Sequence, residues 1–312
     1  MKPTVLLIEP MMESIEAALD AAYEVHRLFQ APDPGALLAE VGPRVRGIAT
    51  GGGSGARREI VDALPKLEII AINGIGTDAV DLVHARERGI RVTTTPGVLT
   101  DDVADLGIAL WLAASRQLCA GDRYVRAGLW GRQALPLAFK ANGKRLGILG
   151  MGRIGRAIAR RAEPFDTRIA YTDIYAFDDL PYAFEPTLLA LASDSDVLIV
   201  AASGGAQSRG IVNAAVLDAL GPHGILVNVA RGTVVDEPAL VAALREGRLG
   251  GAGLDVFLDE PRVPEALWTM DNVVLQPHRA SATVETRTAM GELVLANLAA
   301  QFAGQEPVTP VV

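Results

Sequence analysis

One stretch decides the fold of this chain: Leu146-Gly147-Ile148-Leu149-Gly150-Met151-Gly152-Arg153-Ile154-Gly155. A short apolar run leads into the spacing Gly-x-Gly-x-x-Gly, and a helical pattern follows over residues 156–161. In that context Gly150 permits a tight turn, Gly152 lets the backbone approach a pyrophosphate, and Gly155 lets the helix pack closely on the strand. The free N–H groups and the dipole at the helix start attract phosphate. The stretch therefore predicts a strand–turn–helix unit that binds a dinucleotide.

Asp173 stands where such a unit needs an acid. It follows the next predicted strand, residues 168–172, about 20 residues beyond the glycine loop. A carboxylate at this place accepts hydrogen bonds from the adenosine ribose and repels a 2′-phosphate. Residues 174–177 contain no Arg or Lys that would bind such a phosphate. We therefore expect the cofactor to be NAD rather than NADP.

Strands and helices alternate in two series along the chain. The first series has predicted strands at 4–8, 45–50, 67–72 and 91–95. The second runs from Lys144 to a last predicted strand at 273–276, and long helices are predicted over 101–120 and 284–303. This alternation indicates βαβ units with parallel sheets, and a chain of 312 residues favours two domains. The expected fold is α/β, with two Rossmann-like, doubly wound parallel-sheet domains and a cleft between them.

The composition argues against several classes of function. The formal net charge of −8 disfavours binding to nucleic acid or to anionic lipid. The only cysteine is Cys119, so no disulfide framework and no cysteine-based metal site can form within the chain, and we expect no metal. No apolar run is long enough for a membrane span, and residues 1–9 are typical of a first strand rather than of a signal peptide. The prediction is a cytoplasmic protein without nucleic-acid or membrane partners.

Three polar residues, Arg231, Glu260 and His278, each follow a different predicted strand of the second series. The carboxyl ends of parallel strands line the ligand crevice of such a sheet, so we expect the three side chains to meet there. A guanidinium can hold a carboxylate through two parallel hydrogen bonds and polarise an adjacent keto oxygen. An imidazole can transfer a proton near neutral pH, and a glutamate on its other ring nitrogen fixes its tautomer. The set predicts hydride-transfer chemistry on a keto acid.

The remaining histidines lack such a setting. His26 and His84 lie in the first series with no acidic partner evident from the sequence, and His223 lies in a predicted turn, residues 221–224. We interpret all three as structural or solvated.

Motifs that span most of the chain give a family resemblance. They are Asn73-Gly74-Ile75-Gly76-Thr77-Asp78, Thr95-Pro96-Gly97-Val98-Leu99-Thr100-Asp101-Asp102-Val103-Ala104-Asp105, the glycine loop at 150–155, Val229-Ala230-Arg231-Gly232, Gly253-Leu254-Asp255-Val256-Phe257 and Pro277-His278. The chain resembles D-isomer-specific 2-hydroxyacid dehydrogenases, specifically their glyoxylate/hydroxypyruvate reductase branch. The resemblance implies an enzyme that reduces a small 2-keto acid to the D-2-hydroxy acid with NAD(P)H.

The resemblance also implies a domain division, a dimer and a set of site residues. A substrate-binding, flavodoxin-like domain would comprise 1–99 plus 286–312, and a dinucleotide-binding domain 100–285, with a homodimer built mainly on the latter. Arg231 would bind the substrate carboxylate and carbonyl, His278 would transfer the proton, and Glu260 would orient His278. Asp255 would bind the nicotinamide carboxamide. The implied cofactor contacts are Gly150, Gly152, Arg153, Ile154, Gly155, Asp173, Ala202, Val229, Ala230, Arg231, Asp255, His278 and Ala280. The implied substrate contacts are Thr50, Gly51, Gly52, Gly53, Gly74, Arg231 and His278.

Two departures and two alternatives accompany this interpretation. NADP-using relatives in this branch tend to carry an arginine after the second strand of the dinucleotide-binding domain, where this chain has Asp173-Ile174, which supports NAD and makes the chain atypical of its branch. The strand at 197–202 runs into Ser203, where the family usually has a proline beside the adenine. The first alternative is a pocket for an aryl group lined by Trp130 or Trp268, with an arylpyruvate such as hydroxyphenylpyruvate as the substrate. A non-catalytic protein that senses NADH and binds partners could carry the same fold. A formate dehydrogenase is disfavoured because that relative does not use glutamate, here Glu260, as the partner of its histidine.

Overall fold

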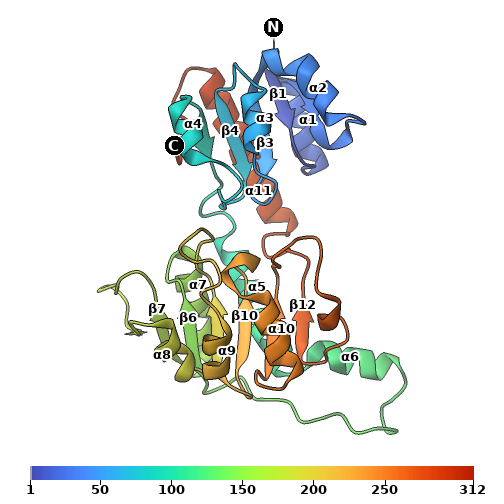
Figure 1. The fold of residues 1–312 in the computed structure, drawn as a ribbon, viewed down its shortest axis with the longest axis vertical. Coiled ribbons are helices and arrows are strands. Elements are labelled where there is room, and N and C mark those ends of the chain that lie inside the picture. Colours follow the sequence, from blue (N-terminus) through green and yellow to red (C-terminus); the bar gives the residue numbers. More distant parts are fainter. Residues whose placement is uncertain (1) are drawn as a thin grey trace. The chain divides into compact units, whose positions relative to one another are not determined.

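The structure is a computed structural model that describes residues 2–312, and its backbone contacts divide the chain into two compact units. Unit 1 comprises the residues up to Leu99 together with Ser281–Val312, and unit 2 comprises Thr100–Ala280. Each unit contains its own sheet (Figure 1). The chain passes from unit 2 back into unit 1 between Ala280 and Ser281, a few residues before the expected domain boundary at 285/286.

Unit 1 is a five-stranded parallel sheet in the order β2-β1-β3-β4-β5. Its strands are β1 (Thr4–Leu7), β2 (Glu24–Arg27), β3 (Val45–Gly51), β4 (Ile69–Asn73) and β5 (Arg91–Thr93). Its helices are α1 (Glu13–Ala22), α2 (Pro34–Val41), α3 (Arg58–Asp62), α4 (Leu82–Glu87) and α11 (Val284–Phe302), with short 3₁₀ turns η1 (Leu28–Gln30) and η2 (Gly42–Arg44). Helices α1 and α11 pack on one face of the sheet, and two apolar clusters fill its two faces.

Unit 2 is a seven-stranded parallel sheet in the order β12-β11-β10-β9-β6-β7-β8. Its strands are β6 (Arg145–Leu149), β7 (Arg168–Thr172), β8 (Ala183–Phe184), β9 (Val197–Val200), β10 (Ile225–Asn228), β11 (Gly251–Leu254) and β12 (Val273–Leu275). Its helices are α5 (Thr100–Ser115), α6 (Leu118–Arg126), α7 (Arg153–Ala162), α8 (Leu188–Ser193), α9 (Ala214–Leu220) and α10 (Glu237–Arg245), with 3₁₀ turns η3 (Glu163–Phe165), η4 (Gly232–Val234) and η5 (Glu265–Leu267). The strand order reverses between β6 and β9, and ligands of doubly wound sheets bind at such a switch point. The predicted α/β fold with two parallel sheets is confirmed.

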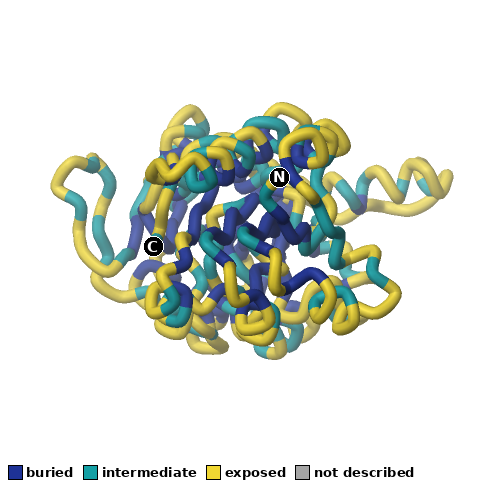
Figure 2. The backbone as a smooth tube through the Cα atoms, turned by 90° about the horizontal axis from the view of Figure 1, so that it is seen from above, coloured by how far each residue is buried: buried dark blue, intermediate teal, exposed yellow. Residues whose placement is uncertain are grey.

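Most of the strands lie in the buried interior of their own unit. Figure 2 shows the buried residues in the middle of the trace and the exposed ones along the loops and outer helices. All four residues of β9 and all four of β10 are buried, because helices cover both faces of a parallel sheet. The cores are built mainly from branched aliphatic side chains, which suit buried strands.

The predicted single helix over 101–120 is wrong, because two helices, α5 and α6, replace it. Gln117 has a φ of 52°, in the left-handed region that ends a right-handed helix. Helix α5 packs on α7, β10 and β11 with Trp111 fully buried, whereas α6 carries the exposed side chains Leu118 and Val125. Among residues 2–312, no single helix is long and apolar enough to cross a membrane; α5 and α6 reach that length only as a pair, bent by 59°.

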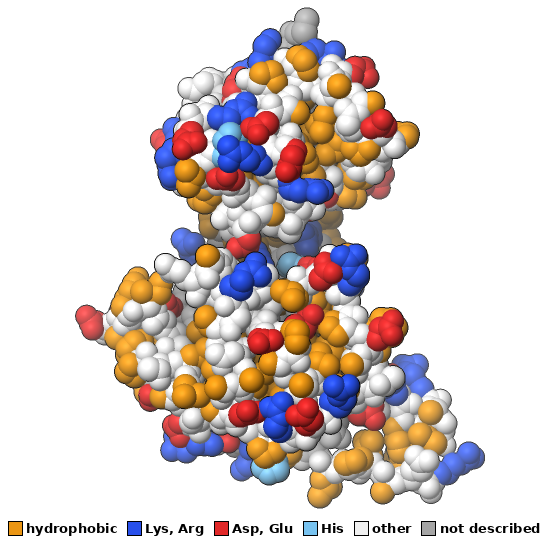
Figure 3. Space-filling model, viewed as in Figure 1, with side chains coloured by type: hydrophobic (Ala, Val, Ile, Leu, Met, Phe, Trp, Pro, Cys, Tyr) orange, Lys and Arg blue, Asp and Glu red, His pale blue; other side chains and the backbone are white. Residues whose placement is uncertain are grey.

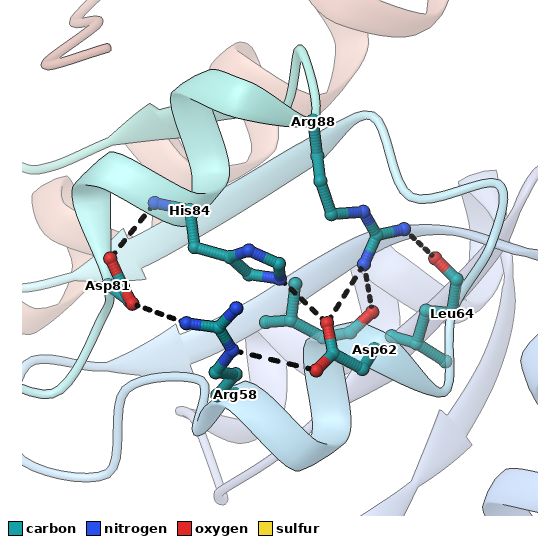
Figure 4. Close-up of polar contacts among 7 residues, drawn as sticks. Arg58, Asp62, Leu64, Asp81, His84 and Arg88 are labelled. Carbon is teal, nitrogen blue, oxygen red and sulfur yellow. Dashed lines mark hydrogen bonds and ion pairs between the residues drawn. The ribbon is translucent and has the colours of Figure 1, made fainter.

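His84 has an acidic partner that the sequence pattern did not reveal, and it links α3 to α4 (Figure 4). Its Nε2 lies 2.6 Å from Asp62 Oδ1, and its backbone N–H donates to Asp81 Oδ1 at 2.9 Å. Arg58 lies 3.5 Å from Asp81 and 3.7 Å from Asp62, and Arg88 donates to two backbone carbonyls near the end of α3. His26 likewise lies 3.2 Å from Glu24. The expectation that these rings lack acidic partners is wrong: Asp62 is 22 residues from His84, whereas Glu24 lies only two residues from His26, in the same strand.

Replacing Asp81 by alanine should lower the free energy of unfolding by about 1 kcal/mol, because the first turn of α4 loses its capping acceptor. Urea unfolding of the variant would be compared with that of Glu87→Ala. Glu87 is an exposed acid on the same helix with no polar contact within residues 2–312. Equal stability losses in the two variants would contradict the capping role.

Candidate active site

The glycine loop has the geometry that a pyrophosphate requires. Gly150 has a φ of 92°, and a Cβ there would lie 2.6 Å from the backbone of Ala202. A Cβ on Gly155 would lie 2.0 Å from the carbonyl oxygen of Gly150, so the start of α7 packs directly on the turn. A Cβ on Gly152 meets nothing within 4 Å, and no side chain caps the helix at that residue. The loop therefore leaves open space in front of the first N–H groups of α7, which fits a dinucleotide phosphate.

Asp173 lies beside this loop at the end of β7. Its Oδ2 accepts the N–H of Met151 at 2.7 Å, and its Oδ1 accepts the N–H of Ile174 at 2.7 Å. The carboxylate is partly exposed, and each of its oxygens has a further lone pair for a ribose hydroxyl. The structure thus fixes the acid against the turn that follows β6.

Three further loops begin at the same edge of the sheet. Strands β10, β11 and β12 are adjacent and parallel, and the residues after them carry Arg231, Glu260 and His278. The Nδ1 of His278 lies 2.7 Å from Glu260 Oε2. Arg231 is near enough to lower the pKa of Glu260 by its charge. The structure therefore brings together all three side chains that the sequence singled out.

The Glu260 carboxyl stays ionised at neutral pH. Burial acts to raise its pKa, but hydrogen bonds from His278 and from the N–H of Phe257 (3.0 Å), together with the charges of His278 and Arg231, lower the pKa below its ordinary value. A carboxylate that is already charged and hydrogen-bonded to Nδ1 holds the imidazole in one orientation. The imidazole is 39% exposed, so a ligand can reach it.

Asp255 shapes the turn that carries His278. It is fully buried, and its two oxygens accept the N–H groups of Arg279 at 2.6 Å and Ala280 at 3.0 Å. Its carbonyl oxygen accepts the N–H of His278 at 2.8 Å, and His278 has a φ of 50°. Burial raises the pKa of Asp255, against the effect of the two N–H donors. This positioning role was not evident from the sequence, because the Arg279 and Ala280 N–H groups reach Asp255 from a distant part of the chain.

A second turn holds the backbone of Arg231. Asn228 accepts the N–H of Ala230 at 3.0 Å and donates to the carbonyl of Arg231 at 3.0 Å. The next residue, Gly232, packs so closely on the loop after β11 that a Cβ there would lie 1.9 Å from the carbonyl carbon of Phe257. No larger residue fits at this position without moving that loop. Val229 and Ala230 lie in the same turn and Ala202 follows β9, so every predicted cofactor residue lies at the carboxyl edge of the unit 2 sheet.

The predicted substrate residues outside this set lie in unit 1. Thr50 and Gly51 end β3, and Gly74 follows β4, the neighbouring strand. A Cβ on Gly74 would lie 3.3 Å from the N of Gly52, so these backbones are in close contact. Thr50 donates to the carbonyl of Gly55 at 2.7 Å, which closes the glycine-rich turn.

Glu9 is a residue of this loop cluster that the sequence analysis missed. It follows β1, the strand on the other side of β3, and a Cβ on Gly51 would lie 1.8 Å from Glu9 Oε1. The carboxylate therefore occupies the space that the glycine leaves open. Within residues 2–312 it has no hydrogen bond or ion pair. Its position directly after an apolar strand was the available signal.

Comparison with known proteins identifies the family. The family model described as D-isomer specific 2-hydroxyacid dehydrogenase, NAD binding domain, matches residues 108–280. A hydroxyphenylpyruvate reductase of Plectranthus scutellarioides is 48% identical over 308 residues, 99% of this chain and 98% of the relative. A 2-ketogluconate reductase of Gluconobacter oxydans is 47% identical over 311 residues, 100% of this chain and 99% of the relative.

A solved structure resembles the whole chain. The NADPH-dependent glyoxylate/hydroxypyruvate reductase of Sinorhizobium meliloti, in complex with NADP and malonate, superposes with a TM-score of 0.92 at 43% identity, over 100% of this chain and 97% of that one. With the loop, the acid and the three polar side chains in place, the chain belongs to the D-isomer specific 2-hydroxyacid dehydrogenase family and is an oxidoreductase with an NAD-binding domain.

Proposed function

We propose that this protein reduces a small 2-keto acid, of the glyoxylate or hydroxypyruvate type, to the D-2-hydroxy acid. The observation that carries the proposal is the His278–Glu260 pair beside Arg231, on the sheet edge that also holds the glycine loop. A bound reduced nicotinamide supplies the hydride. Arg231 binds the substrate carboxylate and polarises the keto oxygen, and Thr50, Gly51–Gly53 and Gly74 keep their predicted role in binding the acid.

Proton transfer falls to His278. The developing charge on the substrate oxygen needs a donor, and Nε2 is the imidazole nitrogen that Glu260 leaves available. The Glu260 carboxylate orients the ring and offsets its positive charge before transfer. Asp255 acts through the backbone of the turn and keeps the ring on Glu260.

The cofactor we propose is NADH. Asp173 repels a 2′-phosphate, and the next residue is Ile174, which is 87% exposed and carries no charge. The Sinorhizobium meliloti relative is NADPH-dependent, so this choice distinguishes our chain from that protein.

Of the two small acids we favour hydroxypyruvate, which carries a hydroxyl group, and we favour either of them over an acid that carries an aryl group. The Glu9 carboxylate beside Gly51 can accept a hydrogen bond from a substrate hydroxyl, and it repels a second carboxylate or a phosphate. Trp130 and Trp268 are 80% and 62% exposed in the structure, which gives no support to an aryl pocket lined by either within unit 2. There are two alternatives to this proposal. The Plectranthus relative supports the first, an arylpyruvate reductase, and the second is an NADH-sensing protein without turnover.

The proposed assembly is a homodimer, and the proposed location, from the sequence alone, is the cytoplasm. Helix α6 and the segment after it carry exposed apolar side chains, among them Trp130 and Leu137, the latter 96% exposed. Hydrophobic atoms gather on this extension at the lower right of Figure 3. An apolar surface of this kind on a soluble chain is typical of a subunit contact.

His278→Ala should lower turnover by about 10²- to 10⁴-fold while NADH affinity changes little, because proton transfer is lost and the nucleotide contacts remain. Turnover would be followed by cofactor absorbance with NADH and NADPH against glyoxylate, hydroxypyruvate, pyruvate and phenylpyruvate. The matched control is His223→Ala, an exposed histidine that precedes the amino end of β10. Equal turnover in both variants refutes the proton-transfer role, and NADH binding without turnover in the unmodified protein favours the sensing alternative.

Glu9→Gln should raise the KM for hydroxypyruvate about three- to tenfold and leave the KM for glyoxylate, which has no hydroxyl, nearly unchanged. A charged acceptor binds a hydroxyl more strongly than an amide oxygen does. Glu13→Gln is the control, since Glu13 is exposed on α1 and has no polar contact among the described residues. Parallel changes for both acids would argue against hydroxyl recognition by Glu9.

Replacing Trp130 and Leu137 together by serine should halve the molar mass in solution, because the apolar surface that drives dimerisation is removed. Light scattering coupled to gel filtration measures the mass. Val83→Ser, at a 62% exposed valine on α4 of unit 1, serves as the control. A double variant that keeps the unmodified mass would place the dimer contact elsewhere.

A further inference from the structure

A clamp of two side chains holds Arg156, the residue directly after the glycine loop. Asp179 binds its guanidinium through two contacts, Nη1 to Oδ2 at 2.5 Å and Nη2 to Oδ1 at 3.2 Å. The ring of Phe177 lies against the same group, with the guanidinium carbon 4.7 Å from the ring centroid. The proposed function uses neither Asp179 nor Phe177.

The clamp lies next to the acid that selects the cofactor. Arg156 Nε donates to the carbonyl of Met151 at 3.2 Å, and the N–H of Met151 donates to Asp173 at 2.7 Å. Met151, a residue of the glycine loop, thus forms hydrogen bonds with both the Asp173 carboxylate and the Arg156 guanidinium. Both charged groups therefore flank the end of the site where the adenosine ribose binds in this fold.

The loop that supplies the clamp is itself ordered by side chains. The N–H of Phe177 donates to the hydroxyl of Tyr171 at 2.7 Å, and the Phe177 ring packs against Tyr175 with the centroids 4.9 Å apart. The hydrogen bond from Arg156 lowers the pKa of Asp179, and Asp179 raises that of Arg156, so both groups are charged at neutral pH. Asp179 thereby accepts hydrogen bonds from both terminal nitrogens of the Arg156 guanidinium.

We propose that the Asp179–Phe177 clamp is a second determinant of cofactor choice, and the inference rests on the proposed NADH-dependent function. A guanidinium is a strong ligand for phosphate, and Arg156 is bonded to the same loop residue as Asp173. The clamp keeps this guanidinium from a 2′-phosphate. Discrimination against NADP therefore has two parts: repulsion by Asp173 and the withholding of a cation by Asp179.

The test is binding of two nucleotide fragments, measured by calorimetry. Adenosine 2′,5′-bisphosphate carries the 2′-phosphate that distinguishes NADP, and 5′-AMP lacks it. Asp179→Asn should tighten binding of the 2′,5′-bisphosphate by about three- to tenfold, because the freed guanidinium gains a phosphate partner. Binding of 5′-AMP should stay within about twofold, which also shows that the loop is intact.

Two matched variants separate the clamp from general charge effects. Asp178→Asn removes the same charge from the same loop, but Asp178 is exposed and has no polar contact among residues 2–312. The double variant Arg156→Gln with Asp179→Asn removes the freed guanidinium and should lose the gain. A gain in Asp178→Asn equal to that in Asp179→Asn, a gain that persists in the double variant, or no gain at all overturns the inference.

Two further outcomes distinguish failure of the proposed function from failure of this inference alone. If the unmodified protein binds neither 5′-AMP nor NADH, the proposed function fails and the inference fails with it. If it binds both but Asp179→Asn loses 5′-AMP, the clamp only supports the loop, and the inference alone is overturned.

Discussion

The site depends on two hydrogen bonds that backbone N–H groups donate to the buried Asp255 carboxylate. A buried carboxylate is unfavourable without hydrogen-bond partners, so Asp255 and the turn that supplies these donors stabilise each other. The same turn places His278 in the left-handed region, a conformation that persists only where surrounding contacts enforce it. As a result of this conformation, the His278 ring lies at hydrogen-bond distance from Glu260.

The parallel sheet of unit 2 explains why such distant residues meet. Asp173, Arg231, Glu260 and His278 each follow a strand at the carboxyl edge of this sheet, and the strand order reverses at β6, so the loops after β6 and β9 separate there. Gly150, Gly155 and Gly232 then let backbones approach to distances that a Cβ would forbid. The proposed nucleotide contacts and the proposed proton-transfer residues share one edge for this reason. The proposed phosphate site is formed by open backbone at the glycine loop, whereas the proposed reacting end is formed by oriented side chains.

The sequence predicted the parts of this arrangement that local patterns encode. The glycine loop follows from spacing, and Arg231, Glu260 and His278 follow from their places after apolar runs. What it missed depends on contacts between distant segments. These are the Asp62 partner of His84, the Glu9 carboxylate against Gly51, and the Asp179 clamp on Arg156. The break between α5 and α6 was missed because a left-handed glutamine has no sequence signature. The two-residue strand β8 is too short to leave a pattern.

The proposed reaction requires that Arg231 and His278 act on one bound keto acid while Glu260 orients the imidazole. A crystal structure with NADH and oxamate, an unreactive analogue of a 2-keto acid, measures this directly. We expect the Arg231 guanidinium and His278 Nε2 both to lie within about 3 Å of oxamate oxygens, with Nδ1 still hydrogen-bonded to Glu260. Oxamate bound away from His278, or an imidazole turned off Glu260, would contradict it.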